Sequence, residues 1–404
     1  MSNGPLLAFV NFIKGSYIIV EGKQNADRFF IIRQGRVRIS KEVEVVEEEE
    51  GHFLGPGDFF GVVSTMSSHS HIETAQAVTD VTLISVQKDQ YPQLIQNNTP
   101  VAMKIILQFS RRMRYLDEAL TRLTLKDNAE SNASHLFNVG EYYARQSQYD
   151  QAFYAYHQYV KHCPGGQDVN LARERMMKIA PYAKSVKTEF RPEETIRTYA
   201  KGAMLFAEGE SGDELYIIQK GSVKIAKIVD NNEVLLAVLK TGDIFGEMAL
   251  LEAKPRTACA VAYEDCKVLA VNRVNFQLMI ATQPQIIARL TTLLSERIWF
   301  IYKQLANTLL KAPMGRIYDA LLIQLEKDRV DLKSSGSHFF DFGPKELLNM
   351  VGVNQGDGAA LLHKLLQNRN IQLMNDKIFS MNVAEIIKQA EYYRKMQKIG
   401  KNTN

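Results

Sequence analysis

The hydrophobic residues of the chain follow two patterns that alternate along the sequence. Short apolar runs separated by glycine turns, such as 29–32 and 215–218, are typical of strands in a small antiparallel barrel or jelly roll. Each set of runs precedes a long stretch, roughly 99–124 and 284–310, in which apolar residues recur every three or four positions. That spacing predicts a helix. The sequence therefore predicts two β units, each with a trailing helix.

The two β units are copies of one pattern, with an offset near 186 residues. Residues 14–22 match 201–209, residues 29–35 match 215–221, and residues 57–61 match 242–246. Self-similarity at a fixed offset indicates a repeated architecture, so we expect the same fold in both copies.

The segment 245–258 carries the clearest chemistry. Gly246 allows a ligand to approach the backbone, and 247–251 favour one short helical turn whose first N–H groups are unpaired, an arrangement suited to an anion. Pro255 ends the turn, and Arg256 follows with a planar fork of donors that suits a phosphate. Glu247 is suited to accept a hydrogen bond from a ribose hydroxyl.

This segment resembles the phosphate-binding cassette of cyclic-nucleotide-binding domains. The resemblance implies that Glu247 holds the ribose 2′-hydroxyl and that Arg256 pairs with the cyclic phosphate, helped by Thr257. It also implies that the site is lined by Gly246, Met248, Ala249 and Ala258. The expected ligand is cAMP or cGMP, with no other cofactor. The alternative is a plain Glu–Arg ion pair on a β loop.

The first copy departs from the second at the two charged positions. Val62 stands in the place of Glu247, and Glu73 in the place of Arg256. Since a carboxylate repels a phosphate, we expect one ligand per chain, bound by the second copy. His69 and His71 lie in the altered loop as solvated side chains or as a metal pair, and the lack of a third ligand favours the first reading. The acidic run 47–50 is expected to extend a solvated hairpin.

A different unit lies between the copies. Leu136, Val139, Gly140 and Tyr143, followed by Ala152, Tyr156 and Pro164, resemble a tetratricopeptide helical pair. A third helix is expected over 168–180. One repeat cannot bury its own face, so a packed helical hairpin is favoured over a peptide-binding groove for protein partners.

The last ninety or so residues predict helices over 314–327, 345–351 and 355–367, with strands over 339–342, 371–374 and 378–381. This order resembles the winged helix-turn-helix of the catabolite activator protein family, which implies DNA contacts. The donors available for them are Gln355, His363, Lys364 and Arg369. Gly356, Asp357 and Gly358 are unusual in a helix that reads bases, and 13 Lys/Arg against 10 Asp/Glu over 312–404 give only +3. Two hypotheses therefore remain for the winged helix: it binds DNA, or it contacts another protein.

The expected organisation is an α+β chain with four parts: a degenerate domain over 1–125, a helical linker over 126–185, a ligand-binding domain over 186–311 and a winged-helix domain over 312–404. A homodimer is expected through a seam of apolar residues on the second long helix. Its members are Ile286, Ile287, Leu290, Leu293, Leu294 and Ile298. Pairing of the two long helices inside one chain is the alternative.

Composition sets outer bounds on the function. No apolar run approaches the ~20 residues that span a bilayer, and the three cysteines form no disulfide framework. These features predict a cytoplasmic protein without a membrane partner. The sequence holds no nucleotide triphosphate loop and no kinase signature, so we do not expect an enzyme. It predicts a cyclic-nucleotide-controlled transcription regulator or, alternatively, a sensor that acts through protein partners.

Overall fold

The structure is a computed structural model, and it describes residues 8–23, 26–41, 53–125, 134–183, 186, 190–191, 193–229, 232–332, 336–353 and 355–401. The acidic run 47–50 lies outside these residues. The chain divides into two compact units. One consists of Met1–Asp89, Tyr115–Lys126 and Ser295–Asn404, and the other of Gln90–Arg114 and Asp127–Leu294. Each unit contains one copy of the repeated β domain.

The first β domain has two four-stranded antiparallel sheets, in the orders β1-β8-β3-β6 and β2-β7-β4-β5. Its elements are β1 Ala8–Phe12, β2 Tyr17–Ile19, β3 Arg28–Gln34, β4 Val37–Ser40, β5 Phe53–Leu54, β6 Phe59–Phe60, α1 Val62–Ser67, β7 Thr74–Ala77 and β8 Val81–Gln87. Alternate strand residues such as Ile32, Val37 and Leu83 meet between the sheets and form the core.

The second β domain repeats this plan with sheets β9-β16-β11-β14 and β10-β15-β12-β13. Its elements are β9 Ile196–Tyr199, β10 Met204–Phe206, β11 Glu214–Lys220, β12 Ser222–Val229, β13 Asn232–Lys240, β14 Ile244–Phe245, α7 Glu247–Glu252, β15 Cys259–Ala262 and β16 Cys266–Asn272. The register shift between Ile32 and Gln34 recurs between Ile218 and Lys220. The repeat predicted from sequence is confirmed down to this irregularity.

Of the two predicted alternatives, barrel and jelly roll, a closed barrel does not form, because each domain keeps two separate four-stranded sheets. Several strands are too short to bridge them: β14 has two residues and β10 has three. A strand of that length can hydrogen-bond with one neighbour but cannot continue into the facing sheet.

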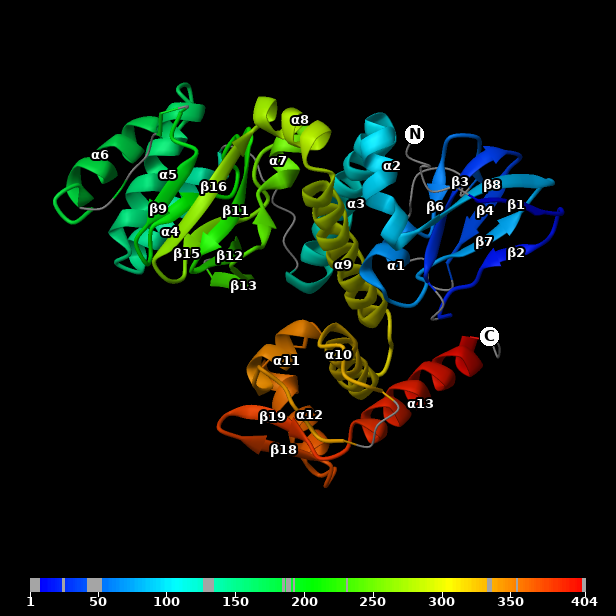
Figure 1. The fold of residues 1–404 in the computed structure, drawn as a ribbon. Helices are drawn as coiled ribbons and strands as arrows, with labels where there is room; N and C mark the ends of the chain where they lie inside the picture. The colour runs from blue at the N-terminus through cyan, green and yellow to red at the C-terminus, as the bar shows by residue number, and fades with distance from the viewer. Residues whose placement is uncertain are drawn as a thin grey trace. The chain divides into compact units, whose positions relative to one another are not determined.

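The predicted helical linker forms three helices, α4 His135–Arg145, α5 Tyr149–His162 and α6 Val169–Ile179. Gly140 lets α4 and α5 pack closely, since a side-chain carbon there would lie 2.6 Å from the ring of Tyr156. Figure 1 shows these helices beside the sheets of the second β domain. Their apolar core continues into that domain through Met204, Cys259 and Val261. The second β domain thus covers the apolar face of these helices, as expected for a packed helical hairpin.

The two trailing helices also occur as predicted. α2 Tyr91–Asn97 leads into α3 Thr99–Leu125, and α8 Arg273–Thr282 leads into α9 Pro284–Thr308. Along α9, Ile287, Leu290 and Leu294 are already buried in a single chain. The homodimer through this seam and the pairing of the two long helices inside one chain both stay predictions. None of the described helices is long and apolar enough to cross a membrane.

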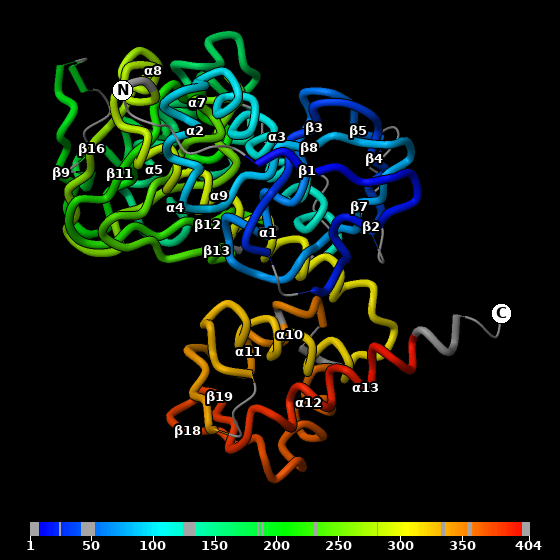
Figure 2. Tube along the Cα trace, turned by 45° about the vertical axis from the view of Figure 1, so that its right-hand side comes forward, coloured from blue at the N-terminus to red at the C-terminus, as the bar shows by residue number. Residues whose placement is uncertain are grey.

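The C-terminal part contains α10 Pro313–Lys327, β17 His338–Phe339, α11 Pro344–Met350, α12 Gln355–Leu366, β18 Ile371–Met374, β19 Lys377–Ser380 and α13 Val383–Lys401. The strands form one antiparallel sheet in the order β17-β19-β18, and Figure 2 shows β18 and β19 within the C-terminal part of the chain, together with α10, α11, α12 and α13. Ile317, Leu321, Leu347 and Leu365 join three of these helices in one core. The predicted sequence of helices and strands is therefore present.

Candidate ligand-binding site

The short helix α7 starts at a glycine with left-handed backbone geometry. Gly246 has φ 75°, a conformation that costs a residue with a Cβ atom but not glycine. The first five residues of α7, from Glu247 to Leu251, are buried. Met248 and Ala249 are among these buried residues, and their predicted place in the wall of a ligand site stays a prediction. Ala253 ends the helix with φ 54°, and the chain then turns back through Pro255 to Arg256.

Arg256 is the central feature of the site, because its guanidinium is buried and only partly paired. The residue is 4% exposed. Its Nη1 donates a hydrogen bond of 2.6 Å to the carbonyl oxygen of Gly246, and its Cζ lies 4.3 Å from the centre of the Phe206 ring. Its Nε has no hydrogen-bond partner among the described residues. A buried cationic donor without a partner is costly, so this place suits an anion.

Two glycines make room for the Arg256 side chain. A side-chain carbon at Gly212 would lie 2.3 Å from its Nε, and one at Gly246 would lie 2.7 Å from its Nη1. The guanidinium thus fits only because both positions lack a Cβ atom. Gly246 was expected to allow close approach, whereas Gly212 was not singled out from sequence.

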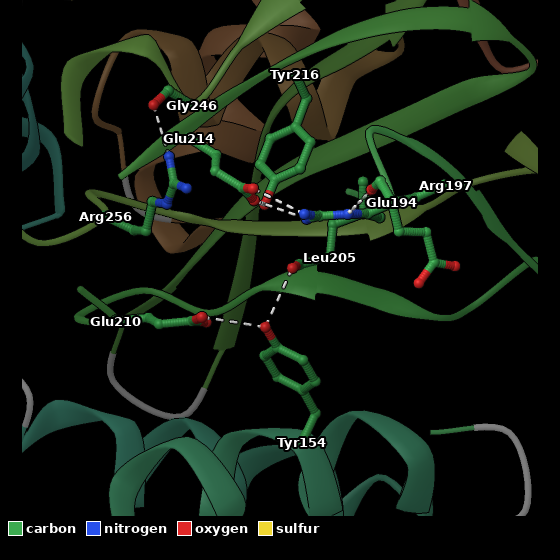
Figure 3. Close-up of polar contacts among 9 residues, drawn as sticks. All are labelled: Tyr154, Glu194, Arg197, Leu205, Glu210, Glu214, Tyr216, Gly246 and Arg256. Carbon is green, nitrogen blue, oxygen red and sulfur yellow. Dashed lines mark hydrogen bonds and ion pairs between the residues drawn. The ribbon is translucent and has the colours of Figure 1, made fainter. Parts of the chain in front are cut away.

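A second buried guanidinium nearby is fully engaged. Arg197 Nη1 and Nη2 donate to the two carboxylate oxygens of Glu214 over 2.6 and 2.7 Å, and its Nε donates to the carbonyl of Glu194. Its Cζ also lies 4.4 Å from the Phe190 ring centre. Figure 3 shows the difference between this paired Arg197 and Arg256. Of these two arginines, Arg256 is the one that retains a donor for a ligand.

The loop beside Arg256 connects the site to the helical linker. The backbone N–H of Arg256 donates to the carbonyl of Glu210 over 2.8 Å. The carboxylate of Glu210 lies 3.1 Å from the hydroxyl of Tyr154 on α5. Burial raises the pKa of Glu210 to about 7, although the N–H of Ala207 and the charge of Arg256 act in the opposite direction. Neither Glu210 nor Tyr154 was identified from sequence.

An open cavity of about 640 Å³ lies where α5 faces this loop. Its wall includes Tyr154, Lys161 and His162 from the helical linker, and Glu210, Asp213 and Tyr216 from the β domain. Water and small polar solutes can therefore reach the Tyr154–Glu210 contact.

Helix α3 also holds the far end of α7. Arg114 Nε donates to the Glu252 carboxylate over 3.1 Å, and Arg114 Nη1 donates to the carbonyl of Pro255 over 3.2 Å. Ser110 adds a bond of 2.7 Å to the same carboxylate. Both side chains of the ion pair are below a tenth exposed. The helix after the first β domain thus fixes the segment that precedes Arg256.

The remaining predicted site residues lie in the same segment. Glu247 is buried at the first position of α7, Thr257 is half-buried next to Arg256, and Ala258 is buried at the start of the following strand region. All seven predicted residues belong to the segment that runs from the start of α7 to the residue before β15: Gly246, Glu247, Met248, Ala249, Arg256, Thr257 and Ala258. Their ligand contacts stay predictions.

The altered segment of the first copy has different partners. Glu73 Oε1 accepts a hydrogen bond of 2.9 Å from the N–H of Gly61 at the start of α1. His69 stacks on Trp299, with ring centres 4.0 Å apart, and His71 is buried. No group of three metal-binding side chains occurs within the described part of the chain. The two histidines are therefore neither solvated loop residues nor part of such a group.

The predicted DNA-contacting residues lie on or just after α12. The helix begins at Gln355, whose side chain lies outside what the structure describes, and His363, Lys364 and Arg369 are exposed. A side-chain carbon at Gly358 would lie 2.4 Å from Leu348 of α11. That glycine is therefore explained by close packing of the two helices.

Comparison with known proteins adds the family. Residues 9–98 and 196–283 match the family described as "Cyclic nucleotide-binding domain". The chain carries two cyclic nucleotide-binding domains. This confirms the resemblance inferred from 245–258 and from the repeat. The tetratricopeptide likeness of the linker has no such support and stays a prediction.

The chain is similar in sequence to regulators of the Crp/Fnr type. The chain is 28% identical over 187 residues to the "CRP-like cAMP-activated global transcriptional regulator" of Mycobacterium tuberculosis, covering 46% of this chain and 73% of the relative. It is 29% identical over 178 residues to the "Cyclic AMP receptor protein" of Thermus thermophilus, covering 44% and 79%. A solved catabolite activator protein from Thermus thermophilus has 27% identity and a TM-score of 0.29 over 49% of this chain and 90% of its own. These relatives are regulators, in agreement with the expectation that the chain is not an enzyme.

Proposed function

We propose that this chain is a cyclic-nucleotide sensor that binds one ligand per chain in its second cyclic nucleotide-binding domain. The buried, partly unpaired guanidinium of Arg256 carries this proposal. A cyclic phosphate beside it supplies an anionic acceptor for its free donor, and a charge-assisted hydrogen bond of this kind is among the strongest in proteins. The names of the relatives favour cAMP over cGMP as the ligand.

The other residues of 246–258 take supporting roles in the proposal. Glu247, buried at the first position of α7, accepts a hydrogen bond from the ribose 2′-hydroxyl. Thr257 adds a hydroxyl donor next to Arg256. The wall around the sugar-phosphate is formed by residues that are small or apolar and can pack closely against it. These are Gly246, Met248, Ala249 and Ala258.

The ligand step is tested by calorimetric titration of the full chain with cAMP, with cGMP and with 5′-AMP as the acyclic control. Saturable binding of a cyclic nucleotide, and weaker binding of 5′-AMP, is the expected result. If neither cyclic nucleotide binds at millimolar concentration (about −4 kcal/mol), the proposal is wrong.

For the output, we propose that 312–404 is a winged helix-turn-helix that contacts DNA through α12 and the residues around it. Gln355, His363, Lys364 and Arg369 are the donors in this proposal, and the named relatives are transcriptional regulators. A shift assay on DNA fragments over a salt series, with and without cAMP, tests it, because DNA contacts release counterions and weaken with salt.

A protein partner is the second candidate for the output, and a specific observation favours it. Ala359 and Ala360 are exposed near the start of α12, where donors would read bases. On the hairpin that follows α12, Leu373 and Met374 are each almost half exposed. Exposed apolar side chains are more typical of protein contacts than of DNA contacts.

A further inference from the structure

One hydroxyl in the linker faces two acceptors at the same distance. Tyr154 Oη lies 3.1 Å from the carbonyl oxygen of Leu205 and 3.1 Å from Oε1 of Glu210. A tyrosine hydroxyl has one proton to donate. Both contacts are full hydrogen bonds when the Glu210 carboxyl is protonated, because it then donates to the Tyr154 oxygen while Tyr154 donates to Leu205. The geometry therefore stabilises a neutral Glu210.

Glu210 is also joined to the ligand-binding arginine through the backbone. Arg256 N–H donates to the carbonyl of Glu210 over 2.8 Å, and Gly209 N–H donates to the carbonyl of Arg256 over 2.9 Å. This pair of bonds fixes the two segments side by side. A shift of the Glu210 side chain at Tyr154 is thus passed to the backbone of Arg256 without an intervening residue. Figure 3 shows Tyr154, Glu210 and Arg256 in this order.

We propose that Tyr154 is a positioning residue for Arg256, acting through Glu210, and that ligand binding takes up a proton at the Tyr154–Glu210 pair. This inference rests on the proposed binding of a cyclic nucleotide at Arg256. It assigns the helical linker a part in sensing, since Tyr154 belongs to α5 and not to the β domain.

The sign of the effect follows from the charges around Glu210. The groups that face it are Arg256, Tyr154 and Lys161 of α5, Tyr216 of β11 and Cys259 of β15. In the free protein, the positive charge of Arg256 favours the ionised carboxylate, while burial holds the pKa of Glu210 at about 7. A bound cyclic phosphate carries one negative charge, which offsets the positive charge of Arg256, so it raises the pKa of Glu210 further. Binding therefore takes up a proton above neutrality.

The pH dependence is then defined. Below about pH 7 Glu210 is protonated with or without ligand, and the affinity is constant. Above that value the affinity falls as pH rises, by up to about tenfold per pH unit, until the pKa of the bound state is passed. Protons reach the pair because Tyr154 and Glu210 line the open cavity. His162 lines the same cavity, but burial lowers its pKa, so it titrates below this window.

The experiment is calorimetric titration of the full chain with cAMP between about pH 6 and about pH 8.5, in two buffers of different ionisation enthalpy that count the protons taken up. Three variants are compared with the parent. Glu210→Gln is neutral at every pH and keeps a donor for Tyr154. Tyr154→Phe removes the hydroxyl alone. Tyr156→Phe is the matched control, because the Tyr156 hydroxyl on the same helix bonds Glu141 inside the linker.

The parent is expected to take up a fraction of a proton above neutrality, with affinity falling as pH rises. Glu210→Gln should bind cAMP at every pH with the affinity that the parent shows below about pH 7. Tyr154→Phe should weaken binding about fivefold and shift the pH at which affinity falls, while Tyr156→Phe keeps the parent's profile. The inference is overturned if the affinity of the parent does not change with pH, or if Glu210→Gln or Tyr154→Phe keeps the parent's dependence of affinity on pH. It is also overturned if Tyr156→Phe shifts that dependence as much as Tyr154→Phe does. Absence of any cyclic-nucleotide binding overturns the proposed function instead.

Discussion

Glu73 accepts a hydrogen bond of 2.9 Å from the backbone N–H of Gly61, at the start of the short helix of the first domain. At the matching place in the second domain, Arg256 donates to the carbonyl of Gly246 over 2.6 Å. Both glycines have left-handed geometry, with φ 79° and 75°. In the first domain, a carboxylate of the chain itself therefore occupies a donor that faces the place of an anion.

This relationship predicts one bound cyclic nucleotide per chain. Glu73 repels a phosphate and is only 8% exposed, so water screens it poorly. Calorimetric titration should give a stoichiometry near one. Glu73→Ala should leave that value unchanged and lower the free energy of unfolding by about 1–3 kcal/mol, because the Gly61 N–H loses its acceptor. A stoichiometry near two in the parent would show that the first domain binds ligand in another way.

Arg256→Ala should weaken cyclic-nucleotide binding by roughly 2–5 kcal/mol, since the phosphate then lies buried without its charged partner. Arg256→Lys should recover little, because a lysine lacks the planar fork of donors. Arg273, whose Nη2 donates to the carbonyl of Leu250 at the other end of α7, provides the comparison. Arg273→Lys should bind nearly as the parent does. Parent-like affinity in Arg256→Ala would remove the phosphate role.

Sequence reasoning located what is contiguous in the chain. The motif around Gly246 and Arg256, the repeat and the two long helices were all visible as local patterns, because glycine turns and helical periodicity leave signals within a few residues. The C-terminal order of helices and strands was recovered for the same reason. The choice between a closed barrel and a jelly roll stayed open, since closure depends on whether strand ends meet across sheets, and no local pattern encodes that.

Contacts between distant segments were not predictable. Tyr154 lies 56 positions from Glu210, and Arg114 lies 138 positions from Glu252. In sequence, Tyr154 is one of many aromatic residues on a helix and Arg114 one of many charged residues on another. Nothing local distinguishes a buried partner from a solvated one. The His69–Trp299 stack was missed for the same reason.

The buried pair Arg114–Glu252 should matter more for stability than a surface pair. Arg114→Ala removes the buried charged partner of the Glu252 carboxylate and leaves only the exposed Lys254, whose Nζ lies 3.7 Å away, which should cost about 3–5 kcal/mol. Lys178→Ala removes a pair whose side chains are 61% and 53% exposed, and should leave the free energy of unfolding almost unchanged, because water screens the two charges. Thermal unfolding followed by circular dichroism compares the two. Equal and small losses of stability in the two variants would show that the Glu252 carboxylate becomes exposed to water in Arg114→Ala.

The His69–Trp299 stack predicts an acid-sensitive contact. Burial, with help from the charges of Arg329, Lys303 and Lys88, lowers the pKa of His69 from 6.5 to about 4. The neutral ring is therefore favoured in the folded chain. This stabilisation is present in full above pH 6.5 and is lost as pH falls through about 4.

Trp299 is the only tryptophan of the chain, so its fluorescence reports this contact directly. The emission should change with a midpoint near pH 4, and His69→Gln should abolish the change. A midpoint near the ordinary value of 6.5 would mean that the imidazole is open to water.

The output end should bind DNA mainly through phosphates, if it binds DNA. His363, Lys364 and Arg369 are exposed donors, whereas Ala359 and Ala360 at the start of α12 cannot hydrogen-bond with base edges through their side chains. Binding should then be weak and tolerant of sequence, and its salt dependence should be shallow because few counterions are released. Moderate salt should still abolish it, because the affinity is low at the outset. Lys364→Ala should weaken binding about equally on every sequence. Asp357→Arg should strengthen it by removing a negative charge near the backbone.

Gel-shift titrations over a salt series, with several unrelated fragments and with and without cAMP, check these expectations. A nanomolar complex with one operator at physiological salt, abolished by Gln355→Ala, would contradict them and establish direct base readout. No DNA binding in any ligand state would favour a protein partner. In that case substitutions to charged residues at the exposed positions Ala359, Ala360, Leu373 and Met374 should disrupt the contact, because a charge placed on an apolar interface is costly to bury.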